Sequence, residues 1–266
     1  MIATGYPPRS LGSNGSKETE IIDVEASYFN CTKVKPFPIN ILRGASGGLI
    51  NGRTPFICGG EGRNGSSLFE SKYCYQLTES GSWIKDQTAT LNTARSDAGK
   101  GGSVVMNKNQ LVLSGGFGMS SNWNWLNSIE LISPNASAKT LSVQLPVGLP
   151  SHCQVPWDSD TFMVIGGFMM SGSRIGVRAE SYFINVKTNQ VTKGPSLKSG
   201  RAEHSCGELE VMGKSYIVVS GGIGGENIQS TEMLDKSNVG QGWQTGKYKT
   251  VFLRICFRDI SLHFRS

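Results

Sequence analysis

A strand-like apolar run that ends in a glycine doublet recurs four times in this chain of 266 residues. The doublets are Gly59-Gly60, Gly115-Gly116, Gly166-Gly167 and Gly221-Gly222, at intervals of 56, 51 and 55 residues. The runs before them are rich in β-branched residues and have the length of a strand. Repetition at this spacing predicts an architecture built from successive similar units.

A second recurring element follows each doublet after a gap of variable length. It combines an acidic residue with apolar or aromatic ones, in the segments at 70–75, 129–132, 180–183 and 231–235. The segment 19–23 matches the last of these, and residues 2–6 stand where the strand and doublet before it belong. The sequence therefore predicts five repeat starts, near residues 5, 59, 115, 166 and 221.

This order of elements resembles the kelch motif, which also carries a Trp (Trp83 and Trp243) and an Arg (Arg95), with about 50 residues per unit. The resemblance covers roughly residues 1–245. It implies an all-β, kelch-type β-propeller in which each unit is a four-stranded sheet that buries its faces against its neighbours. About five blades are expected, in an incomplete ring. The units that start at Gly115 and Gly166 lack the Trp, so their packing must differ.

The repeat pattern stops after Trp243. From Val251 to Ser266 the chain has no glycine and alternates Arg with large apolar residues. We expect residues 246–266 to be a divergent tail outside the native propeller, produced by an imperfect gene model; an amphipathic anchor is the alternative.

The net charge of +6 is concentrated in this tail, where five basic residues and one acidic residue follow position 246. The rest of the chain is close to neutral and has no basic stripe, which argues against nucleic acid as a partner. No apolar run approaches the roughly 20 residues of a membrane span.

Six cysteines and four N-glycosylation sequons leave the compartment open. The cysteines form no CxxC pair and no metal-ligand spacing with the three histidines, so no metal or cofactor is expected. Buried free thiols with unused sequons are one interpretation, and disulfides in an extracellular protein are the other, slightly favoured one.

Three patterns suggest catalysis but fit a structural role better. The segment from Gly60 to Gly65 matches a dinucleotide fingerprint, and that from Gly44 to Gly48 matches a nucleophile elbow around Ser46. Both patterns lead into a predicted strand, whereas the chemistry needs a helix. His152-Cys153 and His204-Ser205-Cys206 occupy similar repeat positions, which favours packing or a disulfide between neighbouring blades. We therefore expect no catalytic residue and no enzyme activity.

Kelch propellers bind partners through the loops that join their second and third strands, here residues 61–69, 117–128, 168–179 and 223–230. Large apolar residues and Arg on such loops are typical of interfaces, unless the loops fold back over their own aromatics. Arg95 and Arg201, near these loops, either bind an acidic partner or serve a structural hydrogen bond. The predicted partner-binding residues are Trp123, Trp125, Phe168, Met169, Arg174, Arg95 and Arg201.

The resemblance thus implies a non-enzymatic scaffold that binds a protein partner on one propeller face. A secreted propeller enzyme or a glycan-binding protein is the rival interpretation.

Overall fold

The computed structural model describes residues 2–3, 19–23, 30–39, 41–64, 67–99, 101–118, 124–171, 174–224 and 228–249. Within them the fold is all-β, as predicted, and the one helical element is a three-residue 3₁₀ turn, η2 (Val239–Gln241). No helix among these residues has the length and apolar character needed to cross a bilayer.

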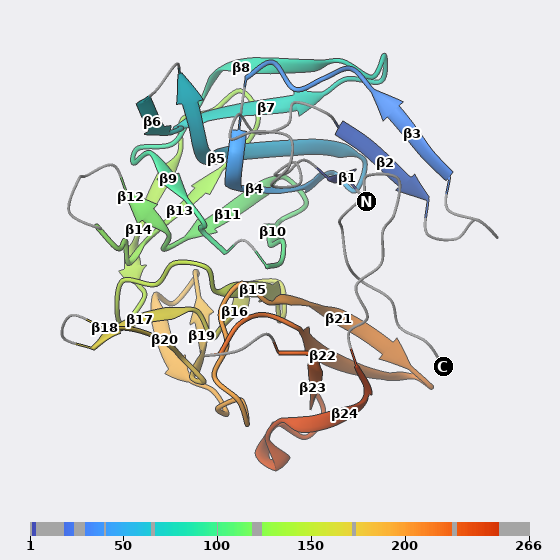
Figure 1. Cartoon of the computed structure of the whole chain (residues 1–266), viewed down its shortest axis with the longest axis vertical. Helices are drawn as coiled ribbons and strands as arrows, with labels where there is room; N and C mark the ends of the chain where they lie inside the picture. The colour runs from blue at the N-terminus through green and yellow to red at the C-terminus, as the bar shows by residue number, and fades with distance from the viewer. Residues whose placement is uncertain are drawn as a thin grey trace.

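Five antiparallel sheets follow one another in chain order around the molecule (Figure 1). Sheet 1 contains β1 (Ile2–Ala3), β2 (Thr19–Asp23) and β3 (Asn30–Val34). Sheet 2 contains β4 (Ile41–Ile50), β5 (Thr54–Asn64), β7 (Tyr73–Leu77) and β8 (Trp83–Thr90), with β6 (Ser67–Glu70) paired to the end of β5. Sheet 3 contains β10 (Val105–Met106), β11 (Gln110–Ser114), β13 (Ser128–Ile132) and β14 (Lys139–Gln144).

Sheets 4 and 5 repeat the same topology. Sheet 4 contains β15 (Cys153–Pro156), β16 (Thr161–Ile165), β19 (Ser181–Asn185) and β20 (Gln190–Lys193). Sheet 5 contains β21 (Ser205–Val211), β22 (Lys214–Ser220), β23 (Ser230–Asp235) and β24 (Gln244–Lys249). Two small ribbons complete the described strands: β9 (Arg95–Ser96) pairs with β12 (Phe117–Gly118), and β17 (Phe168–Ser171) pairs with β18 (Arg174–Val177).

The glycine doublets end the second strand of sheets 3 to 5 and lie within the long β5 of sheet 2. All eight doublet glycines have φ between +61° and +104°, where a side chain would be strained. Space is also limiting, because a Cβ on Gly115 would lie 2.3 Å from the carbonyl oxygen of Leu149. The doublet therefore sets both the turn out of the second strand and the close approach of the next connecting segment.

The core lies between consecutive sheets, because the inner strands are apolar on both faces. One cluster joins Phe56 of sheet 2 to Leu111 of sheet 3, and another joins Val112 of sheet 3 to Phe162 of sheet 4. A third joins Ile165 of sheet 4 to Val219 of sheet 5. Burial of both faces explains the continuous apolar runs that precede the doublets.

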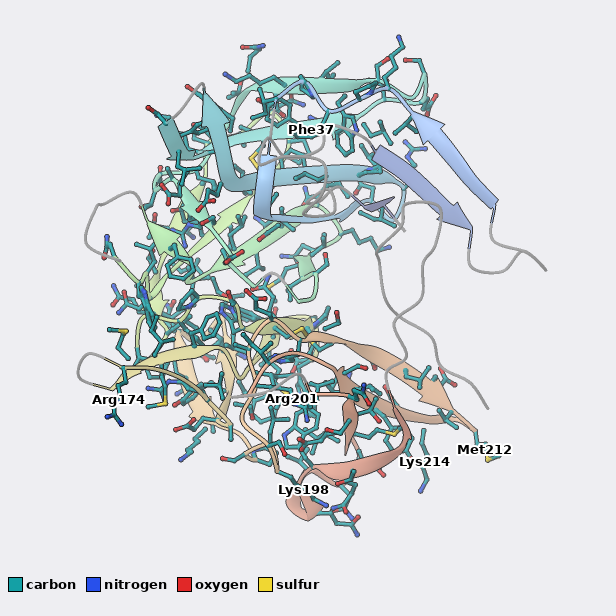
Figure 2. The ribbon with its side chains drawn as sticks, viewed as in Figure 1. Phe37, Arg174, Lys198, Arg201, Met212 and Lys214 are labelled. Carbon is teal, nitrogen blue, oxygen red and sulfur yellow. A yellow bond between two sulfur atoms is a disulfide. The ribbon has the colours of Figure 1, made fainter. Side chains whose placement is uncertain are left out.

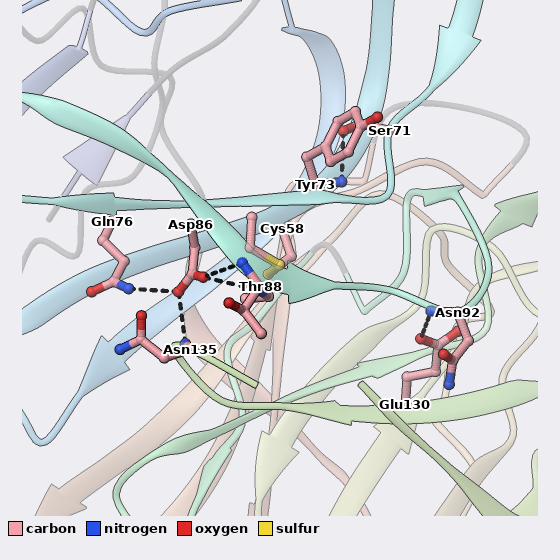
Figure 3. The surroundings of a disulfide bond; sticks show 11 residues. Cys58, Ser71, Tyr73, Gln76, Asp86, Thr88, Asn92, Glu130 and Asn135 are labelled. Atoms are coloured by element: carbon pink, nitrogen blue, oxygen red, sulfur yellow. Dashed lines mark hydrogen bonds between the residues drawn. A yellow bond between two sulfur atoms is a disulfide. The ribbon is translucent and has the colours of Figure 1, made fainter. Parts of the chain in front are cut away.

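Polar contacts also cross the gaps between sheets, and Asp86 on β8 provides one near the Cys58–Cys74 disulfide (Figure 3). Its carboxylate accepts from Gln76 Nε2, from the backbone N–H groups of Thr88 and Ala89, and from Asn135 N of sheet 3, all within 2.8–3.0 Å. Burial raises the pKa of Asp86, but these donors outweigh it and hold the pKa below its usual value. Asp86 is therefore an ionised link from sheet 2 to sheet 3.

A further link runs through the segments that enter each sheet. Gly44, Asp97, Ser151 and Glu203 all have φ between +54° and +71°. They are joined in series, because Asp97 N donates to Gly44 O, Ser151 N to Asp97 O and Glu203 N to Ser151 O, at 2.8–3.0 Å. The first strand of sheet 2 and the connections that enter sheets 3, 4 and 5 thus share one left-handed conformation and one line of backbone hydrogen bonds.

The two ends of the repeat also bear on the sequence predictions. The early strands at 2–3 and 19–23 pair as expected, with Ile2 opposite Ile21. At the other end β24 runs to Lys249, past the boundary placed at residue 245. The remainder of the predicted tail, residues 250–266, lies outside the described residues.

Candidate partner-binding face

The described segments that join the second and third strands of sheets 2, 3 and 4 lie along one side of the molecule (Figure 1). In Figure 1 the β6 strand, the β12 strand and the β17–β18 ribbon all lie at its left edge, although they belong to three successive units. The sequence placed these loops together, and the structure does the same for their described parts. Trp123 and Met119 lie outside the described residues, so the prediction for Trp123 is not tested.

The β17–β18 ribbon carries two large exposed apolar side chains on this face, and Leu68 of β6, 54% exposed, is a third. Met170 and Ile175 are paired directly across it and are 48% and 53% exposed. Arg174 is exposed beside them and points away from the sheets (Figure 2). The predicted residues Phe168 and Met169 are half-buried, and Met169 packs against Gly176. The apolar character of this loop therefore reaches solvent through Met170 and Ile175 more than through Phe168 and Met169.

The ribbon is held to the body of the protein at both of its ends. Phe168 N donates to Pro150 O at 3.0 Å, and Arg178 N donates to Gly167 O at 2.8 Å. Arg201 N in turn donates to Arg178 O at 2.9 Å. These bonds tie the ribbon to the connections that enter sheets 4 and 5, so its exposed side chains have a fixed base.

The neighbouring loop partly folds back on itself, the alternative that the sequence left open. Trp125 forms an antiparallel bridge with Phe117, and their rings meet edge to face at 6.0 Å. Trp125 is half-buried, and its backbone crowds Gly148 in the connection that continues to Pro150. This connection lies between the Trp125 loop and the β17–β18 ribbon, so the two loops share a support.

The prediction that Arg95 and Arg201 bind a partner is wrong, because both side chains are 0% exposed. Arg95 Nη1 donates to Gly115 O and Ser128 O, each at 3.0 Å, and Nη2 bonds Ser128 Oγ and Glu130. Arg201 makes the same set of bonds in sheet 5: Nη1 reaches Gly221 O and Ser230 O, and Nη2 reaches Ser230 Oγ and Glu232.

The glutamates of these two buried pairs are bonded from a second direction. Glu130 accepts the backbone N–H groups of Asn92 and Thr93, and Glu232 accepts those of Lys198 and Ser199, at 2.7–3.1 Å. Each Arg–Glu pair therefore fastens a connecting segment to the doublet and third strand of the next sheet. This is the structural role that the sequence offered as the alternative.

The two motifs that suggested cofactor or acyl chemistry lie in strands. Gly59 to Gly62 belong to β5, which continues into the β6 hairpin. Ser46 lies within β4, is buried, and donates its hydroxyl to Ala98 O. Neither segment is followed by a helix, so both patterns keep their structural explanation.

The repeated His and Cys residues lie in the interior near the first strands of sheets 4 and 5. Cys153 and Cys206 form a disulfide between β15 and β21, the second of the two structural explanations that the sequence offered, packing or a bridge between neighbouring units. His152 bonds Ser114 Oγ and Leu149 O at 2.8 and 2.9 Å, whereas neither ring nitrogen of His204 has a hydrogen-bond partner in the described structure. No group of three or more potential metal ligands occurs among the described residues.

Burial is the main cause of the lowered pKa of both histidines. Desolvation lowers the pKa of His152 to about 4, against a smaller opposing effect of its bond to Leu149. Desolvation, with the positive charge of Arg201 and the proximity of His152, lowers the pKa of His204 to about 3. Both imidazoles are therefore neutral at physiological pH.

The sequence did not predict the Cys58–Cys74 disulfide, which joins β5 and β7 of one sheet. A signal existed, since Cys58 immediately precedes a doublet and Cys74 lies on the strand that pairs with it. The pairing of each buried Arg with a Glu was also missed. It could have been found from the occurrence of Glu130 and Glu232 at equivalent repeat positions.

Comparison with known proteins places the fold and leaves the family unassigned. No family model matches the chain, and neither does any curated protein. A solved structure described as "Structure of YjhT" is similar, with a TM-score of 0.68 over 88% of this chain and 78% of that one, at 13% sequence identity. At this identity the likeness concerns the fold alone.

Proposed function

We propose that the described sheets are consecutive blades of a kelch-type β-propeller and that the protein is a non-enzymatic scaffold for a protein partner. Four sheets with one topology, doublets at equivalent positions and cores between consecutive sheets support the propeller. The partner binds on the side that carries β6, β12 and the β17–β18 ribbon.

The observation that carries this proposal is the exposed apolar pair Met170 and Ile175 on an anchored ribbon. Two large apolar side chains facing water across one strand pair gain free energy when a partner covers them. Arg174 beside them supplies a cation that pairs with a carboxylate on the partner. Because both ends of the ribbon are bonded to the body, little conformational entropy is lost on binding.

The proposal is tested with a photo-crosslinking residue at position 175, which captures the partner in the protein's native source for identification. Affinity is then measured with the purified partner for Met170→Glu combined with Ile175→Glu. We expect binding at least tenfold weaker, since two carboxylates would be buried against the partner.

A matched control replaces two exposed apolar residues of sheet 5, Leu209→Glu with Val211→Glu, which lie on the β21–β22 hairpin. It should bind normally. Equal loss in both double variants, or no specific crosslink from position 175, would contradict the proposed face.

A further inference from the structure

A cavity of about 380 Å³ opens at the end of β16 opposite the β17–β18 ribbon. Its wall includes Trp157 and Asp158 from the β15–β16 turn and the side chains of Gln190 and Thr192 on β20. Val239 of η2, in the connection between β23 and β24, borders it on the side of sheet 5, and the cavity is largely open to solvent. The cavity is thus formed by two sheets and is separate from the proposed partner-binding face.

One part of its lining is aromatic. Trp157 and Phe183 are half-buried, with ring centroids 4.8 Å apart and planes at 67°. Both pack against the apolar cluster between sheets 4 and 5, which fixes their position. The cavity therefore has a rigid aromatic surface that can cover the apolar face of a ligand.

The rest of the lining is polar and arranged by strand register. Phe183 lies opposite Thr192 and Asn185 opposite Gln190 in the β19–β20 pair, so the aromatic and polar side chains stand on one face. Gln190 and Thr192 are exposed, and their side chains make no hydrogen bond to the described part of the chain. Together they offer an amide and a hydroxyl, which both donate and accept.

The polar side chains beside Gln190 and Thr192 already make hydrogen bonds within the protein, and they set the shape of the cavity. Asn185 donates to Thr161 Oγ1 at 3.1 Å and accepts the N–H groups of Lys187 and Thr188 at 3.0 and 2.8 Å. Asp158 Oδ1 accepts Asp160 N at 2.9 Å, which leaves its second oxygen to accept from a ligand. Asn185 is therefore held in place, while Gln190, Thr192 and the second oxygen of Asp158 remain able to bond a ligand.

The charges nearby exclude two other ligand classes. The Lys236 ammonium already lies 5.2 Å from the centre of the Trp157 ring, so it occupies the cation–π position and repels a second cation. Lys236 also donates to Trp157 O and Glu208 at 2.9 Å, and the lining itself holds Asp158 and no cation. Because Lys236 is already paired with Glu208, an anionic ligand would meet the Asp158 carboxylate with no unpaired cation in the lining.

We propose that this cavity binds a saccharide, one sugar residue of a glycan. A pyranose ring has an apolar C–H face that packs on Trp157 and Phe183, and hydroxyl groups that bond Gln190, Thr192 and Asp158. The size is that of a small-molecule site. The proposal is independent of the partner-binding face.

Saturation-transfer NMR with a panel of methyl glycosides at millimolar concentration tests the proposal, with Trp fluorescence as a second readout. We expect at least one glycoside to bind. Gln190→Ala with Thr192→Ala should weaken that glycoside at least tenfold, and Trp157→Phe should weaken it while keeping the fold.

The matched control is Val191→Ala with Lys193→Ala, which changes the alternate positions of the same strand and should leave binding unchanged. Tetramethylammonium and inorganic phosphate are included as probes. Binding of either in preference to every glycoside, no glycoside binding, or equal loss in both double variants would overturn the proposal. Normal partner capture by the Gln190 and Thr192 variant would separate this site from the proposed function.

Discussion

The segments that enter sheets 4 and 5, residues 145–152 and 197–204, have the same backbone and different side-chain chemistry. Each accepts a hydrogen bond from the second glycine of a doublet, Gly116 N to Leu149 O at 3.0 Å and Gly167 N to Arg201 O at 2.9 Å. Each then passes through a left-handed residue, Ser151 or Glu203, and reaches a buried histidine.

The two segments differ two residues before the left-handed residue, at Leu149 in the first segment and Arg201 in the second. Arg201 pairs with Glu232 on the third strand of sheet 5, whereas Leu149 stands at the Arg position in the segment that enters sheet 4. Tyr182 occupies the position of Glu232 there, because Val164 pairs with Tyr182 as Val219 pairs with Glu232. Leu149 and Tyr182 belong to one apolar cluster.

The histidines differ as well, and for a reason that lies in the preceding sheet. His152 bonds Ser114, the residue before a doublet, while the equivalent residue near His204 is the apolar Ile165. The two connections therefore share their backbone hydrogen bonds. Their side chains differ: the connection into sheet 4 makes an apolar contact, and the connection into sheet 5 makes an ion pair.

Arg201→Leu should lower the free energy of unfolding by roughly 5 kcal/mol. It leaves Glu232 buried without its cation and removes the donors to Gly221 O and Ser230 O. Denaturant unfolding followed by Trp fluorescence measures the change. Arg95→Leu should have a similar effect, since its bonds in sheet 3 are equivalent.

The double variant Arg201→Leu with Glu232→Tyr copies the pair that sheet 4 already uses and should recover part of that loss, although the N–H groups of Lys198 and Ser199 still lose their acceptor. Apolar replacement of a complete buried ion pair is often neutral, whereas removal of one partner is not. A double variant as unstable as the single one would show that the two connections are not interchangeable.

Removal of the Cys153–Cys206 disulfide should cost about 4 kcal/mol, because it closes a loop of 53 residues between two sheets. The Cys58–Cys74 bridge spans 16 residues within one sheet and should cost about 3 kcal/mol. Paired Cys→Ala variants, compared by their thermal midpoints, measure both losses. A larger loss for the Cys58–Cys74 bridge would contradict the loop-length argument.

The sequence predicted the repeat because each doublet is required locally by positive φ, and the doublet is present in four successive units. It also predicted the bridge between units as one of two alternatives, since Cys153 and Cys206 follow histidines at matching positions. The burial of Arg95 and Arg201 could not be read from either residue alone, because it depends on a glutamate more than 30 residues away. The cavity beside Trp157 was missed because its lining comes from two units and follows no repeat position.

The two histidines should respond in opposite directions to replacement by leucine. His152→Leu removes two hydrogen bonds and should destabilise the protein by about 2 kcal/mol at pH 7. His204→Leu replaces a buried group without hydrogen-bond partners in the described structure by an apolar one, and should be neutral or stabilising by up to about 1 kcal/mol. Equal destabilisation by both variants would contradict the comparison.

The histidine-to-leucine variants should also differ from the wild type in how much stability they lose in acid. Because the folded-state pKa values are about 4 for His152 and about 3 for His204, against an ordinary histidine pKa of 6.5, the unfolded chain binds more protons below pH 6.5. Stability is therefore complete above that pH and falls as the pH drops toward 4, by about 1.4 kcal/mol per pH unit for each histidine. Denaturant midpoints between pH 7 and pH 4 should show a shallower fall for His204→Leu than for the wild type. An unchanged slope would mean that His204 gains its proton without unfolding.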